Sequence, residues 1–96
     1  MNRDDELATV LNGLVTLLQF CARSEVAGWF EARRSEILRG GEPDASVARG
    51  LVRARIPGMA GLDDIFLESP DEEVLSTSDA NAEKLRLQEL LWTLTR

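Results

Sequence analysis

The sequence contains no histidine and no tyrosine among its 96 residues, and its only cysteine is Cys21. Histidine is the usual proton carrier near neutral pH and the commonest nitrogen ligand of metals, so its absence excludes catalytic triads and histidine-based dyads within this chain. One cysteine cannot form an intramolecular disulfide and leaves too few thiolates for a structural zinc site. We therefore expect a protein that is not an enzyme, with no metal and no cofactor.

Long apolar runs are also missing. The chain has no stretch of ~18 residues without a charge, which a membrane-spanning helix requires. Its first residues are acidic where a signal peptide would have a basic segment followed by an apolar one. A lone cysteine is typical of a reducing compartment. We expect a soluble, cytoplasmic protein with no signal peptide and no membrane partner.

Apolar residues recur every three or four positions in most of the chain, a spacing typical of amphipathic helices. The four predicted helices run from Asp4 or Asp5 to about Ala22, from Glu25 to about Arg39, from Asp44 or Ser46 to Ile56, and from Ser78 or Asp79 almost to the carboxyl terminus. The first has the widest apolar face, which predicts a central position. We predict an all-α fold, a compact bundle of about four helices forming a single domain over residues 1–96, with Cys21 and the pair Trp29-Phe30 in its core.

An irregular Pro/Gly segment from Ile56 to Leu67 separates the third and fourth predicted helices. Pro57 ends the incoming helix, and Gly58 and Gly61 provide positions where a positive φ has no side-chain penalty. Three apolar residues of this segment are expected to anchor it to the core: Leu62, Ile65 and Phe66. The segment is either irregular throughout or forms one short strand near Ile65–Leu67, for which no pairing strand is evident.

The same segment begins the strongest charge asymmetry in the chain. The formal net charge is −6, and no basic residue occurs between Ile56 and Glu83. A surface of one sign attracts an oppositely charged protein and disfavours wrong partners. The predicted partner-binding residues are Asp63, Asp64, Glu68, Asp71, Glu72 and Glu73. They lack the alternating oxygen ligands and central glycine of an EF-hand loop, so we predict no calcium site.

Our leading hypothesis is a non-enzymatic protein-binding module, such as an acidic immunity protein or an inhibitor of a basic partner. The alternative is a helical homodimer that acts as a structural subunit. Leu85 and Trp92 lie seven residues apart on the fourth predicted helix and form a second apolar stripe, which we predict as the dimer seam.

A DNA-binding regulator is the third hypothesis. Arg49, Arg53 and Arg55 lie along one side of the short third helix, as basic residues do on a recognition helix. The acidic net charge opposes attraction to phosphate, so we expect no nucleic-acid partner.

The turn at Gly58–Ile65 carries the one family resemblance. Its sequence, Gly-Met-Ala-Gly-Leu-Asp-Asp-Ile, resembles the Gly-Met-Gly-Ser-Leu/Phe-Asn-Asp-Leu turn of a family of small uncharacterised bacterial proteins, a domain of unknown function. Four positions match literally, and a Trp-Phe pair in the preceding helical half, here Trp29-Phe30, also fits. Ala60, Gly61 and Asp63 depart from the family pattern. The resemblance implies a bacterial cytosolic origin and supplies no catalytic residue.

Overall fold

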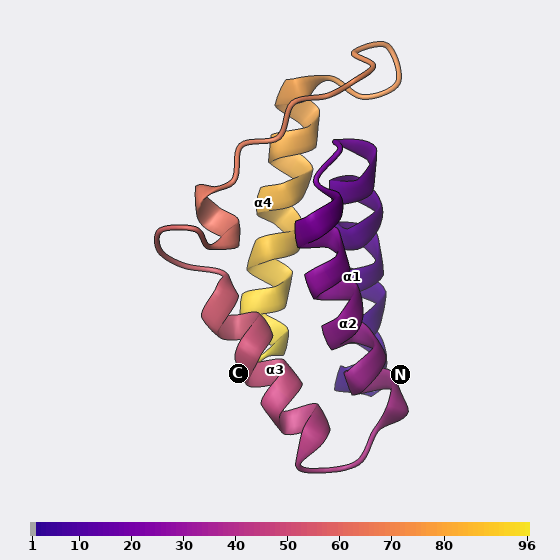
Figure 1. The fold of residues 1–96 in the computed structure, drawn as a ribbon, viewed down its shortest axis with the longest axis vertical. Helices are drawn as coiled ribbons and strands as arrows, with labels where there is room; N and C mark the ends of the chain where they lie inside the picture. Colours follow the sequence, from indigo (N-terminus) through magenta and orange to yellow (C-terminus); the bar gives the residue numbers. More distant parts are fainter. Residues whose placement is uncertain (1) are drawn as a thin grey trace.

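A computed structural model describes residues 2–96 and shows four α-helices and one short 3-10 turn within that range (Figure 1). The elements are α1 (Arg3–Phe20), α2 (Ser24–Arg39), α3 (Asp44–Arg55), η1 (Leu62–Asp64) and α4 (Thr77–Leu94). The dominance of helix confirms the predicted all-α bundle. No helix in the described range is both long enough and apolar enough to cross a bilayer.

Helix α1 occupies the predicted central position, because α2 and α4 both pack against it. Its leucines are all buried and are joined in one core by side chains from the other three helices. The largest fully buried side chains are Leu7, Leu11, Leu14, Leu18, Phe30, Val52, Leu62, Leu67 and Leu91. Cys21 and Phe30 lie in the core as expected, while Trp29 is partly buried against Phe30 with the two rings edge to face.

Three of the four helix starts differ from the predictions by one or two residues, and α3 starts at Asp44 as predicted. Asn2, rather than an aspartate, caps α1, since its side-chain oxygen accepts a hydrogen bond of 2.8 Å from the Asp5 N–H. Ser76 caps α4 in the same way through the Asp79 N–H at 2.9 Å. Both caps have extended backbone, which is the conformation that lets a short side chain reach back to a free amide. Helix α2 starts at Ser24, one residue before the predicted Glu25.

Helix α3 ends at Arg55, directly before the Ile56–Pro57 step, as predicted. Gly58 has the expected positive φ of 86°, but Gly61 does not: its φ is −81°, and Ala60 takes the positive value of 62°. Glycine is required at position 61 for a different reason. A Cβ there would lie 2.4 Å from the Pro57 carbonyl oxygen, closer than non-bonded atoms approach.

The segment near Ile65–Leu67 is irregular, the first of the two predicted alternatives, and residues 2–96 contain no strand. After η1 the chain is extended and runs beside α4 toward the loop at the top of Figure 1. Leu67 is fully buried and Ile65 is partly buried, whereas Phe66, predicted to anchor the segment, is 60% exposed. Successive side chains of an extended segment point to opposite faces, so Phe66 faces outward when its two neighbours face the core.

Candidate functional site

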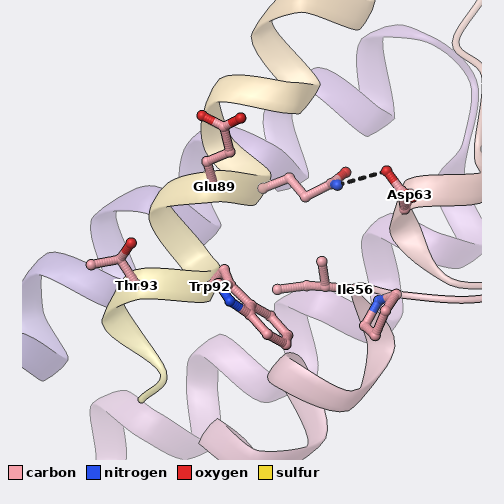
Figure 2. A pocket seen from close by; sticks show the side chains of 7 residues that line it. Ile56, Asp63, Glu89, Trp92 and Thr93 are labelled. Atoms are coloured by element: carbon pink, nitrogen blue, oxygen red, sulfur yellow. Dashed lines mark hydrogen bonds between the residues drawn. The ribbon is translucent and has the colours of Figure 1, made fainter.

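A groove lies between the end of α3, the η1 turn and the carboxyl-terminal half of α4 (Figure 2). Its volume is about 410 Å³, and it is lined by Ile56, Pro57, Asp63, Gln88, Glu89, Trp92 and Thr93. The only charged side chains in this lining are the two carboxylates, Asp63 and Glu89. The groove therefore combines apolar side chains with two negatively charged ones.

Three polar side chains of α4 hold in place the segment from Leu62 to Leu67, which carries Asp63. Asn81 bonds to the backbone of Leu67, the Lys84 ammonium donates to the Leu62 carbonyl at 2.8 Å, and the Gln88 amide donates to Asp63 Oδ1 at 2.9 Å. Residues three and four apart share one face of a helix. These side chains therefore form a row along α4 against which the segment from Leu62 to Leu67 lies.

The row was not predicted from the sequence, although a signal for it exists. Asn81, Lys84 and Gln88 interrupt an otherwise apolar face of the fourth helix at helical spacing. Polar side chains buried on such a face need hydrogen-bonding partners. In this fold the partners are the backbone and one carboxylate of the irregular segment.

Lys84 is buried, with 6% of its surface exposed. Burial lowers the pKa of its ammonium, and the nearby charge of Asp63 opposes that change. The Lys84 ammonium therefore offsets part of the negative charge that Asp63 presents to the groove.

Gln88 is the most unusual residue of the lining. It is 8% exposed, and its Oε1 atom has no hydrogen-bond partner within residues 2–96. A buried carbonyl oxygen without a donor costs about 1–3 kcal/mol. The donation from its amide nitrogen to Asp63 determines which way the amide faces, since the reverse orientation would place two oxygens against each other.

Trp92 forms the lower wall of the groove in Figure 2. The Arg53 guanidinium lies 3.5 Å from the centroid of its ring and also donates to the Trp92 carbonyl at 2.6 Å. This combination of a cation–π contact and a charged hydrogen bond holds the ring in one orientation. Both predicted seam residues are exposed, Leu85 by 50% and Trp92 by 38%, but only Trp92 lines the groove.

Of the six acidic residues predicted to bind a partner, the fold brings only Asp63 into the groove. Glu89, which was not predicted, joins it there from α4. Glu89 precedes Trp92 by three residues and so shares its helix face, which is the sequence signal that would have identified it. Glu68 and Glu73 are exposed outside the groove.

The other three predicted carboxylates stabilise loops. Asp64 accepts a hydrogen bond from the Ala60 N–H at 3.3 Å. Asp71 accepts from the N–H groups of Glu73 and Val74, and Glu72 accepts from both the N–H and the hydroxyl of Thr77. These are the local bonds by which Asp and Glu side chains shape turns, and they leave each carboxylate less available to a partner.

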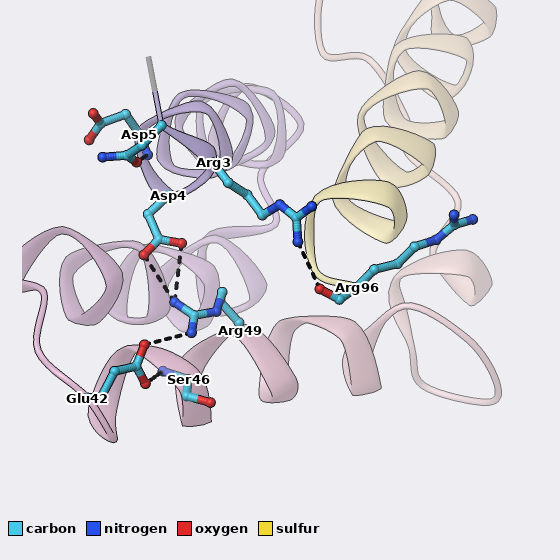
Figure 3. Close-up of polar contacts among 8 residues, drawn as sticks. Arg3, Asp4, Asp5, Glu42, Ser46, Arg49 and Arg96 are labelled. Carbon is cyan, nitrogen blue, oxygen red and sulfur yellow. Dashed lines mark hydrogen bonds and ion pairs between the residues drawn. The ribbon is translucent and has the colours of Figure 1, made fainter.

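The three arginines considered for DNA binding all have partners within the chain. Arg49 bonds to Asp4 at 3.0 Å and to Glu42 at 2.7 Å, joining α3 to the start of α1 (Figure 3). Its guanidinium lowers the pKa of the Glu42 carboxyl. Arg53 is occupied at Trp92, and the Arg55 guanidinium lies 4.7 Å from the centre of the Trp29 ring.

A larger hollow of about 590 Å³ lies between α2 and α3. Its charged lining residues have both signs: Arg33, Glu36, Arg39 and Asp44. Arg33 and Glu36 pair with each other at 2.7 Å. Because the hollow offers no single sign of charge, the groove at Trp92 is the stronger candidate for selective binding.

Comparison with known proteins identifies no similar family, relative or fold. The chain matches no protein-family model, no curated protein and no solved structure. Within residues 2–96, no three cysteine, aspartate or glutamate side chains gather closely enough to hold a metal ion.

Proposed function

We propose that this chain is a non-enzymatic protein-binding module whose groove receives a basic segment of a partner protein. The observation that carries the proposal is the lining of the groove, in which Asp63 and Glu89 flank an apolar surface of Ile56, Pro57 and Trp92. Apolar centres with polar rims are typical of protein interfaces, and tryptophan is enriched among the residues that dominate binding.

The charge of the whole chain supports a basic partner. With a net charge of −6 and no basic residue from 56 to 83, the protein attracts positively charged proteins at long range. Proteins that act on nucleic acids have positive surfaces. The specific role that we propose is that of an immunity protein or inhibitor that neutralises such a partner.

A homodimer is the second candidate, and the exposure of Leu85 and Trp92 favours it. A two-fold axis at this surface would bring Asp63 and Glu89 of one copy near those of the other, which like-charge repulsion opposes. Sedimentation velocity at several protein and salt concentrations separates the two candidates. A dimer that Leu85→Glu abolishes would support self-association, whereas a monomer favours a basic partner.

DNA binding is the weakest of the three candidates, because Arg49, Arg53 and Arg55 already have intramolecular partners. A titration of the chain with duplex DNA at low salt tests it. Affinity that falls steeply as salt rises would support DNA binding, and the absence of affinity would remove it.

The proposal is tested with the full chain as bait in an extract of the source cell. Wild type is compared with Asp63→Asn/Glu89→Gln and with the matched control Glu68→Gln/Glu73→Gln, which removes two carboxylates outside the groove. We expect wild type and control to capture the same basic protein and the groove variant to lose it. With purified components the groove variant should bind about tenfold more weakly, since two exposed ion pairs contribute about 0.2–1 kcal/mol each. Equal binding by all three would contradict the proposal.

A further inference from the structure

We infer that the groove holds a lysine side chain of the partner, with its ammonium between Asp63 and the Oε1 atom of Gln88. This inference rests on the proposed function and specifies which chemical group the groove recognises. It depends on an observation separate from the acidic lining, namely the buried and unpaired oxygen of Gln88.

The two acceptors are neighbours, because the Gln88 amide nitrogen donates to Asp63 Oδ1 at 2.9 Å. That bond leaves Asp63 Oδ2 and Gln88 Oε1 for an incoming donor. Less than 1 Å² of the Gln88 oxygen is exposed in the free protein, so the amide must turn to meet the ligand and exchange its bond to Asp63 for a bond to the ammonium. The last torsion of a glutamine side chain has a broad energy profile, which permits this rotation.

An ammonium fits this pair of acceptors better than a guanidinium does. Its three N–H donors can be shared among separate oxygens such as Gln88 Oε1 and Asp63 Oδ2, whereas a planar guanidinium prefers both oxygens of one carboxylate. The apolar surface of Ile56, Pro57 and Trp92 matches the four-carbon stem of lysine. The Arg53 guanidinium already covers one face of the Trp92 ring, so a second guanidinium cannot stack on that face.

The balance of charges around the site favours the binding of one added cation. Glu89 lines the groove beside Asp63, so two carboxylates face the ligand. Lys84 and Arg53 are cations close to the lining, and each is bonded to a backbone carbonyl, of Leu62 and of Trp92 respectively. Lys84 offsets part of the charge of Asp63, which leaves Glu89 and the remaining charge of Asp63 to attract the ligand.

Nuclear magnetic resonance titration of the isotope-labelled full chain tests the inference. The probe is a short amphipathic helical peptide of leucine and lysine, compared with versions in which every lysine is replaced by arginine or by glutamine. The side-chain amide of Gln88 and the indole N–H of Trp92 report on the two ends of the site. We expect the lysine peptide to shift both signals saturably and to bind about tenfold more tightly than the other two. Gln88→Met should remove this preference while circular dichroism shows an intact helical fold.

Each other outcome overturns the inference in a distinguishable way. If the basic peptides shift Trp92 but leave the Gln88 amide unchanged, the lysine site is wrong while groove binding, and with it the proposed function, survives. If the arginine peptide binds as tightly as the lysine peptide, the groove selects charge alone. If no peptide shifts either signal, the lysine site fails and the groove loses its support as a binding surface.

Discussion

Asn81 pairs with both polar groups of the Leu67 backbone. The Leu67 N–H donates to Asn81 Oδ1 at 2.9 Å, and Asn81 Nδ2 donates back to the Leu67 carbonyl at 2.8 Å. One side-chain amide thus replaces the neighbouring strand that an extended segment would otherwise need. This pairing attaches the segment after η1 to α4 and so contributes to the wall that carries Asp63.

Asn81→Ala should destabilise the protein by at least about 1–3 kcal/mol, because both hydrogen bonds to Leu67 are lost at about 0.5–1.5 kcal/mol each, together with the bond from Asn81 to the Thr77 carbonyl. Urea unfolding followed by circular dichroism measures the change. Asn12→Ala is the matched control, since Asn12 is exposed on α1. The control should be neutral or slightly stabilising because alanine favours helix. If Asn81→Ala lowered the free energy of unfolding no more than Asn12→Ala does, the result would contradict the bridging role of Asn81.

Lys84→Met should remove a pH dependence of stability. Burial holds the pKa of Lys84 below its ordinary value of 10.5. Between the lowered pKa and 10.5, the unfolded chain therefore binds the proton more tightly than the folded protein does. The resulting cost is fully present below the lowered pKa and disappears as pH rises toward 10.5. Wild type should therefore become more stable relative to the variant as the pH rises toward 10.5.

The comparison uses the difference in free energy of unfolding between wild type and Lys84→Met, so that the contributions of other titrating groups cancel. Cys21 is one such group, because burial raises the pKa of its thiol in both proteins. Urea unfolding at several pH values measures the difference. If it does not change with pH, the ammonium of Lys84 is not desolvated in the folded protein.

Arg53→Met should destabilise the protein by about 1–3 kcal/mol. The change removes a cation–π contact with Trp92 and a charged hydrogen bond to its carbonyl, while keeping an apolar stem of similar length. Trp92 emission can be followed alone in a Trp29→Phe background, since the chain has two tryptophans. We expect a changed emission maximum and weaker binding in the groove. Arg53→Lys should be intermediate, and an unchanged emission in both variants would show that Arg53 does not orient the ring.

Gly61→Ala and Gly50→Ala should have opposite effects. A methyl at position 61 would meet three backbone oxygens, the nearest at 2.4 Å, whereas a methyl at position 50 meets nothing within 4 Å. Overpacking against backbone costs about 1–3 kcal/mol, and glycine to alanine within α3 should stabilise by about 0.5–1 kcal/mol. Thermal unfolding of both variants measures the effects. If Gly61→Ala stabilised the protein, the turn would be able to open and admit the methyl group without a loss of free energy.

Much of the fold was predictable because helix formation is a local property. Apolar spacing located all four helices, and the Ile56–Pro57 step located the end of α3. The errors at helix starts are also local in origin. Several polar residues precede each helix, and the sequence does not say which of them adopts the extended backbone that a cap requires.

The candidate site depended on information that no local pattern contains. The charge change after Pro57 and the exposed stripe with Trp92 were visible in the sequence, but it did not show that Asp63 and Glu89 face one groove. Gln88 and Asp63 are 25 residues apart in the sequence. They come into contact only because the segment after α3 runs back along α4.

The sequence by itself therefore determined the helices, the place where they are interrupted and the acidic character of residues 56–83. Only the tertiary structure decided that Phe66 faces solvent, that Asp71 and Glu72 are used within their own loop, and that an unpaired oxygen of Gln88 lies beside Asp63. The physical reason is that backbone preferences and helical spacing act over a few residues. Burial and hydrogen bonding, in contrast, depend on which distant segments the folded chain brings together.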